Sequence, residues 1–196
     1  MMGASFAQSA EAQFIDQSQN IANSFNASSS RVGQTFKPAQ SNVVGAGAFV
    51  YNPTHDKFTA VLSVELWAGG IANQVGAVLI ASGTQSYTLG AGARSWVDAF
   101  WTAVSVTPGT TYFVDYGSTK SSNRFGRFCC AKPSLAYVSG DLYRGQSPST
   151  STTYVKVQES DLTFREYATV TPEPASMVLV ATGLVGVFGI ARRRKA

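Results

Sequence analysis

The chain has 196 residues, of which 44% are hydrophobic and only 13% are charged, and its formal net charge is +4. Four adjacent cations near the C-terminus supply this excess, because the rest of the chain balances 11 Lys and Arg against 11 Asp and Glu. A neutral body of this size argues against nucleic-acid binding and is long enough for one domain with a real core. Its many Ser, Thr, Gly, Ala and Val residues are typical of a secreted β-protein rather than a cytosolic helical enzyme.

Residues 1–13 lack the cationic segment and the apolar core of a signal peptide. Small residues nevertheless recur at Ala4, Ala7, Ala10 and Ala12, as at the end of such a peptide. Two interpretations stay open. Either the start codon is placed too far downstream and these residues are the remnant of a signal peptide, or they are an ordinary polar leader.

The body, residues 14–169, has the patterns of β-strands almost throughout, and no ten-residue amphipathic helix competes. Residues 56–68 alternate most clearly, which predicts a half-buried strand. Its predicted inward residues are Phe58, Ala60, Leu62, Val64 and Leu66, and its outward residues are Thr59, Val61, Ser63, Glu65 and Trp67. The other predicted strands are 32–36, 43–51, 76–81, 95–106, 111–116, 135–138 and 161–169. Gly and Pro turns separate them, and 147–153 is a predicted loop, so we expect an antiparallel β-sandwich.

Three short phrases of the body are similar to phrases of jelly-roll domains in secreted bacterial proteins. They are VGQTF at 32–36, VTPGTTY at 106–112 and DLTFREY at 161–167. In such domains the first phrase opens the sandwich, the second turns into a strand, and the third closes the sandwich beside the first. The resemblance implies a jelly-roll-like fold, but it implies little about function because one sandwich hosts many functions.

Catalytic motifs are scarce in this sequence. The single histidine, His55, lies in a polar turn without Cys or carboxylate ligands at metal spacing, which argues against a zinc site. No nucleophile elbow, phosphate loop or dinucleotide fingerprint is present. We therefore expect no enzyme, no cofactor and no metal. The alternative is a secreted glycoside or ester hydrolase, for which the available carboxylates are Asp98, Asp115, Asp141 and Glu159.

The two cysteines, Cys129 and Cys130, are adjacent. They could form a strained vicinal disulfide in an exported protein, or they could be two thiols on opposite faces of a strand. The jelly-roll resemblance also implies a structural calcium in some relatives, for which Asp16 and Asp161 are the nearest candidates here, although none is expected.

Aromatic residues are the remaining signal for a ligand. Trp67, Trp96 and Trp101 are candidate glycan contacts, because a flat ring can stack on the C–H face of a sugar. The alternative for each ring is a place in the core. Trp96 and Trp101 are an odd number of residues apart, so an unbulged strand would point them to opposite faces.

The C-terminal segment carries a different signal. Residues 175–191 contain no charge and no amphipathic stripe, and as a helix they would be about 25 Å long, near the short end of a bilayer span. The cations Arg192, Arg193, Arg194 and Lys195 follow and would hold that end in the cytoplasm. We therefore predict a single C-terminal transmembrane helix and a body delivered to the outside.

Pro172, Glu173 and Pro174 precede this run, and the two prolines favour an extended segment. The tripeptide, the hydrophobic span and the basic end, together residues 170–196, resemble the PEP-CTERM sorting signal of Gram-negative bacteria. The resemblance implies cleavage near the tripeptide by exosortase, a membrane-embedded enzyme similar to cysteine proteases. It also implies association with exopolysaccharide and biofilm systems.

These inferences predict an exported protein that is first anchored in the inner membrane and then reaches the cell surface or the extracellular matrix. The expected partners are exosortase, the membrane and polysaccharide or partner proteins bound by the sandwich, with no nucleic acid.

Overall fold

The computed structural model describes residues 12–22, 24–27, 31–118, 127–131, 137–145, 153–158 and 160–170, with the side chains of 24–27, 118 and 127–131 excepted. The chain divides into two compact units. One is Gln13–Thr169, which contains all the strands, and the other combines Met1–Ala12 with Val170–Ala196. The described residues form no helix, so this part of the chain is all β.

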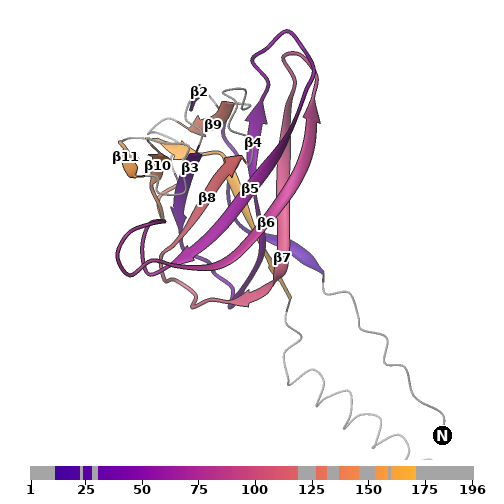
Figure 1. Ribbon diagram of the computed structural model, residues 1–196. Coiled ribbons are helices and arrows are strands. Elements are labelled where there is room, and N and C mark those ends of the chain that lie inside the picture. The colour runs from indigo at the N-terminus through magenta and orange to yellow at the C-terminus, as the bar shows by residue number, and fades with distance from the viewer. Residues whose placement is uncertain are drawn as a thin grey trace, which may run out of the picture. The chain divides into compact units, whose positions relative to one another are not determined.

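Thirteen strands are described, and they pair in two antiparallel sheets that form a β-sandwich (Figure 1). The first sheet contains β1 (Gln13–Gln19), β2 (Ser24–Ala27), β4 (Asn42–Tyr51), β7 (Arg94–Ser105), β9 (Arg127–Ala131), β12 (Asp161–Leu162) and β13 (Phe164–Thr169). The second sheet contains β3 (Arg31–Phe36), β5 (Phe58–Ala68), β6 (Val78–Leu89), β8 (Tyr112–Ser118), β10 (Leu142–Gly145) and β11 (Tyr154–Val157).

The order of the first sheet is β1-β13-β4-β9-β12, with β7 paired to β4 and β2 paired to β9. The order of the second sheet is β11-β10-β3-β8-β5-β6. Hence β6 and β7, which follow one another in the chain, are edge strands of different sheets. The first and last strands are neighbours, because Gln13 pairs with Thr169.

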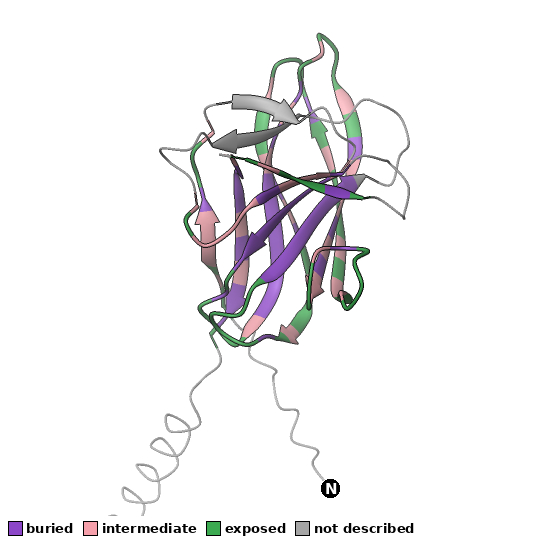
Figure 2. Ribbon diagram, turned by 90° about the vertical axis from the view of Figure 1, so that its left-hand side faces the viewer, coloured by how far each residue is buried: buried purple, intermediate pink, exposed green. Residues whose placement is uncertain are grey.

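The core fills the space between the two sheets, where the buried positions recur along the central strands (Figure 2). The rings of Phe36 on β3 and Phe164 on β13 lie 6.3 Å apart across this space. A hydrogen bond also crosses it, since the hydroxyl of Tyr116 donates to the carbonyl of Gly47 at 3.2 Å. Burial of this apolar surface is the main source of stability for the sandwich.

The opening and closing phrases lie in different sheets, β3 in the second and β12 and β13 in the first, so they are not neighbouring strands and meet only through side-chain contacts between the sheets. Gln34 of the opening phrase is fully buried and donates through Nε2 to Oδ1 of Asp161 at 2.9 Å. Its Oε1 accepts from the backbone N–H of Leu162 at 2.9 Å. A buried amide that makes these bonds fixes the closing strand against the opening one, because leaving it unpaired would be costly.

The predicted register of residues 56–68 is confirmed. Leu62, Val64 and Leu66 have no exposure, while Thr59 on the opposite face is exposed. Predicted strands that are confirmed, with small shifts of their ends, are 32–36, 43–51, 56–68, 95–106, 111–116 and 161–169, the last divided between β12 and β13. A strand at 135–138 is wrong in its described part, because residues 137 and 138 belong to no strand.

The prediction for 76–81 covers only the start of β6, which continues to Leu89. Residues 82–88 are mostly small or polar, and as an edge strand β6 needs no apolar alternation there. The strands β1, β2, β9, β10 and β11 were not predicted for the same lack of a clear pattern.

The predicted membrane helix 175–191 lies outside the described residues, as do residues 1–11 of the leader and 147–152 of the predicted loop. Within the described ranges, no helix is long and apolar enough to cross a membrane.

Candidate functional site

Three side chains of β7 form a row on the outer face of the first sheet. Val97 and Ala99 are buried in the core. The alternate residues Trp96, Asp98 and Phe100 therefore point away from it. Phe100 keeps 45% of its surface exposed. The row thus presents an aromatic ring, a carboxylate and a second aromatic ring.

Two glycines of β4 make room for this row. Gly45 pairs with Phe100, and Gly47 pairs with Asp98. A Cβ at Gly47 would lie 1.9 Å from Oδ1 of Asp98, and a Cβ at Gly45 would lie 2.5 Å from the Phe100 ring. Any larger residue would displace these side chains, so the bare β4 backbone forms the floor of the row.

Arg165 on β13 reaches this floor from the other side, since it pairs with Gly47. Its Nε donates to Oδ1 of Asp98 at 2.7 Å, and its Nη2 bonds the second carboxylate oxygen. The guanidinium carbon lies 4.3 Å from the centroid of the Trp96 ring. The paired charges cancel, and the cation–π contact holds the Trp96 ring in place.

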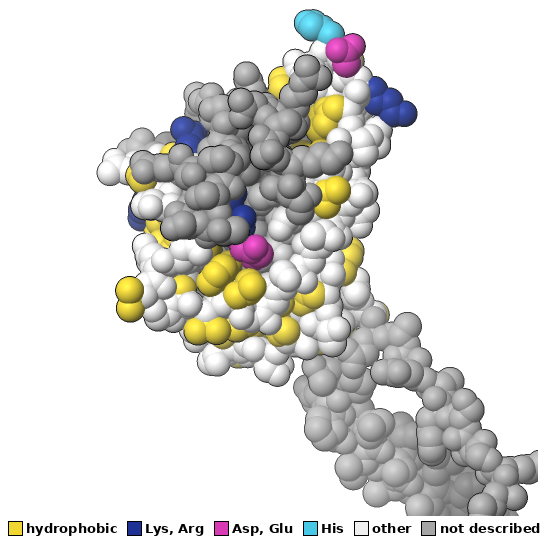
Figure 3. Space-filling view, in the orientation of Figure 1, with side chains coloured by type: hydrophobic (Ala, Val, Ile, Leu, Met, Phe, Trp, Pro, Cys, Tyr) yellow, Lys and Arg dark blue, Asp and Glu magenta, His cyan; other side chains and the backbone are white. Residues whose placement is uncertain are grey.

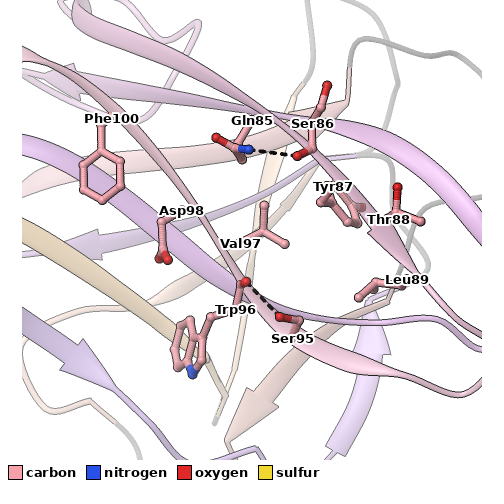
Figure 4. Close-up of a pocket in the computed structure, with 10 residues that line it drawn as sticks. All are labelled: Gln85, Ser86, Tyr87, Thr88, Leu89, Ser95, Trp96, Val97, Asp98 and Phe100. Carbon is pink, nitrogen blue, oxygen red and sulfur yellow. Dashed lines mark hydrogen bonds between the residues drawn. The ribbon is translucent and has the colours of Figure 1, made fainter.

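A groove runs between β6 and β7, the two edge strands (Figure 4). Its volume is about 280 Å³, and it is lined by residues 85–89 of β6 and by 95–98 and Phe100 of β7. No backbone ladder joins these two strands, both of which are described in full. The side chains and free strand edges of the groove can therefore meet a ligand.

The groove is closed at both ends. At one end the chain turns from β6 into β7, where the N–H of Ala93 donates to the carbonyl of Gly90 at 3.1 Å. At the other end the two strands approach closely, because a Cβ at Gly83 would lie 2.8 Å from the carbonyl oxygen of Phe100. Between these ends lie residues 84–89, about 20 Å of strand.

Tyr87 belongs to the inward face of β6. It pairs with Ala60, and its ring meets the Phe58 ring edge-on at 5.9 Å. The hydroxyl oxygen is buried and has no hydrogen-bond partner in the described structure. Burial raises the pKa of Tyr87 to about 12, so the hydroxyl stays protonated. Because it is buried, this hydroxyl is not accessible from the groove.

A second polar cluster lies on the outer face of the second sheet. Arg31 donates through Nη2 to Oε2 of Glu65 at 2.8 Å and through Nε to Oδ2 of Asp115 at 2.7 Å. Asp115 has no exposure, and burial raises its pKa to about 6 although Arg31 opposes this. Arg31 thus forms ion pairs with both Glu65 and Asp115, and Asp115 is shielded from water. The cluster therefore joins β3, β5 and β8 by ion pairs.

The three tryptophans of the sequence prediction have different surroundings. Trp96 points outward and Trp101 inward, where its Nε1 donates to the carbonyl of Val43 at 3.2 Å, so the predicted opposite orientation is confirmed. Trp67 points away from the main core as predicted, but it packs against Phe113 and is half-buried. Their role as glycan contacts stays a prediction. Trp96 borders the groove, but its ring lies against Arg165 and Phe49 on the outer face of the first sheet.

The other carboxylates considered for hydrolysis do not converge. Asp98 is paired with Arg165, and Asp141 binds Lys156 at 2.7 Å. Glu159 lies outside the described residues.

The two candidate calcium ligands have separate partners. Asp16 accepts from the backbone N–H of Ala39 at 2.7 Å, whereas Asp161 accepts from Gln34 and from the N–H of Tyr137. Among the described residues, no three His, Cys, Asp or Glu side chains gather as metal ligands. Cys129 and Cys130 fall in β9, whose side chains are outside the described part.

Several residues of the site were not predicted from the sequence. Alternation in the closing phrase places Arg165 on the outer face, but it does not reveal a partner 67 positions away. Gln85 and Tyr87 belong to the polar part of β6, which carried no strand signal.

The C-terminal residues Pro172, Glu173 and Pro174 and the cations 192–195 lie outside the described residues. Residues 170–195 match the PEP-CTERM protein-sorting motif. The chain therefore carries the sorting signal of an exported, membrane-anchored precursor that is directed to exosortase. No curated protein matches the chain.

Proposed function

From the PEP-CTERM motif that follows the β-sandwich, we propose that the chain is an exosortase-processed protein displayed at the cell surface or in the extracellular matrix. In this proposal the sandwich, jelly-roll-like in its topology, has no catalytic role and binds glycan or partner proteins in an exopolysaccharide or biofilm setting. The motif at residues 170–195 is the observation that carries the proposal.

The proposed route has two steps. Residues 175–191 insert as a helix, and the basic cluster 192–195 keeps its end in the cytoplasm. Exosortase then cuts near residues 172–174, where the two prolines keep the chain extended and accessible. The sandwich is ready for release, since its last strand, β13, ends at Thr169, directly before the cut.

The charges of the body support display rather than hydrolysis. Asp98, Asp115 and Asp141 are each bound to a cation, and none of these pairs leaves a free acid and base facing one cleft. The alternative of a secreted hydrolase has no comparable observation in its favour.

Replacement of Pro172, Glu173 and Pro174 by alanine tests the processing step in a host with exosortase. In a pulse-chase experiment we expect the triple variant to remain in the membrane at full length while the wild type matures. A matched control replaces three residues of the exposed β5–β6 loop, 73–75, by alanine and should mature normally. Maturation of the tail variant at the wild-type rate would show that exosortase does not recognise this segment.

A further inference from the structure

We propose that Asn42 is a positioning residue for exosortase processing, because its side chain fixes the last strand residue of the folded body, Thr169, close to the cleavage segment. This inference rests on the proposed function and adds to it a limit on the body side of the cut. Two residues separate Thr169 from the tripeptide 172–174. The stretch between the fixed residue and the hydrophobic run is therefore 170–174, which spans roughly 17 Å when extended.

The side chain of Asn42 binds both backbone groups of Thr169. Its Oδ1 accepts from the N–H of Thr169 at 2.9 Å, and its Nδ2 donates to the carbonyl oxygen of Thr169 at 3.2 Å. The same Oδ1 also accepts from the Thr169 hydroxyl at 3.2 Å. We call the two backbone bonds the Asn42 clamp. An amide that makes both of them takes the place of a neighbouring strand, so it holds the end of β13 as a ladder would.

The Asn42 clamp lies where the backbone ladder between β4 and β13 stops. The last pair of that ladder is Gly45 with Tyr167, although β13 continues to Thr169. Close to this point β4 is irregular, since its register with β7 shifts between Val43 and Gly45. Without the side chain of Asn42, the backbone of Thr169 would lose its partners on the β4 side, and an unpartnered strand end frays.

The first strand covers the other side of the same end. Gln13 of β1 pairs with Thr169, and the N–H of Val170 donates to the carbonyl of Ala12 at 3.4 Å. Thr169 is buried, whereas Val170 keeps 56% of its surface exposed. The boundary between protected and exposed chain therefore falls between Thr169 and Val170.

This boundary limits what a protease can bind. An enzyme that takes its substrate as an extended strand needs the backbone N–H and C=O groups of that strand free. Residues up to Thr169 are bonded within the sheet and stay closed to the enzyme until the strand end opens. Among the described side chains on the face drawn in Figure 3, charges are few and scattered, so this face offers the enzyme no charged patch to hold. The Asn42 clamp thus sets where the accessible stretch begins.

A shortened linker tests this limit in pulse-chase experiments on the full chain in a host with exosortase. Deletion of Val170 and Thr171 places Pro172 directly after the clamp. We expect maturation to slow roughly threefold or more, because the clamp must then open before the enzyme binds. Asn42→Ala in the deleted chain should restore a rate near that of the wild type. An undiminished rate in the deleted chain, or no rescue by Asn42→Ala, would overturn the proposal.

Two controls separate the Asn42 clamp from general stability. Thr169→Val in the deleted chain removes the hydroxyl contact and keeps both backbone bonds, so it should not rescue maturation. Leu62→Ala in the deleted chain destabilises the core from β5 of the second sheet and should not rescue it either. Rescue by either control would show that general loosening of the fold sets the rate, which would overturn the role of Asn42.

Hydrogen exchange of the purified full chain measures the clamp without exosortase. Asn42→Ala removes both backbone bonds and should lower the protection of the Thr169 amide at least ~10-fold, while the amide of Val64 in the second sheet keeps its protection. Unchanged protection of Thr169 would refute the clamp. Failure of the wild-type chain to mature would refute the proposed function and this inference with it, whereas normal wild-type maturation without rescue would refute only this inference.

Discussion

The stability of this sandwich should fall as the pH rises, because of one buried carboxyl group. Glu166 lies on the inward face of β13 with no exposure, and both carboxyl oxygens are buried without a hydrogen bond of good geometry in the described structure. Burial, and then the neighbouring Asp16 carboxylate, raises the pKa of Glu166 from 4.5 to about 9. The folded protein therefore keeps a proton that the unfolded chain loses near its ordinary pKa.

The direction and the magnitude of this pH effect follow from proton linkage. Between 4.5 and about 9 the folded state holds more protons than the unfolded state, so the free energy of unfolding falls with rising pH. The slope is about 1.4 kcal/mol per pH unit, or roughly 2 kcal/mol between pH 7 and 8.5. Asp115 also lowers the stability as the pH rises, but its pKa is raised only to about 6, so this loss is complete before pH 7.

Urea melts of the wild type and Glu166→Gln at about pH 7 and 8.5 measure this effect. The wild type should lose roughly 2 kcal/mol across the window, and Glu166→Gln should lose little, because the amide does not titrate. Asp56→Asn, a change at an exposed carboxylate, is the matched control and should keep the wild-type slope. Equal slopes in the wild type and Glu166→Gln would refute the argument.

Two further stability contrasts follow from the packing. Leu62→Ala removes a fully buried side chain and should lower the free energy of unfolding by about 2–5 kcal/mol in urea melts. Thr59→Ala, on the exposed face of the same strand, should change it by less than about 0.5 kcal/mol. Similar effects of the two substitutions would place the strand in another register. Gly47→Ala should lower the free energy of unfolding by roughly 1–3 kcal/mol, because the new Cβ would displace Asp98. Gly90→Ala has open space around its Cβ and should leave stability nearly unchanged. An equally small effect of Gly47→Ala would contradict the close packing of Asp98 on the β4 backbone.

The strand that the sequence predicts most clearly, β5, has one buried face. In β5 the alternation of Leu62, Val64 and Leu66 with polar residues reports directly that one side meets the core. The edge strand β6 has solvent on much of both faces, so Ser82 to Thr88 carry no such pattern, and sequence reasoning ends the strand near Ala81. Alternation in the sequence therefore identifies the buried face of a strand, but it does not identify an edge strand that is exposed on both faces.

The candidate site is less predictable because it depends on contacts between distant segments. Alternation places Trp96 and Asp98 on one face of β7, but their meeting with Arg165 requires Gly47 between them, which only the strand order reveals. The groove itself exists because β6 and β7 end different sheets. By contrast, the tail is a linear signal, so residues 170–195 were recognised without any fold.

The central claim is that the tail is a sorting signal removed during export. The most direct measurement is the intact mass of the protein secreted by a host with exosortase. The account predicts a C-terminus near residues 171–174, with the hydrophobic run and the cations 192–195 absent. A secreted protein whose mass still includes the residues up to Ala196 would contradict it.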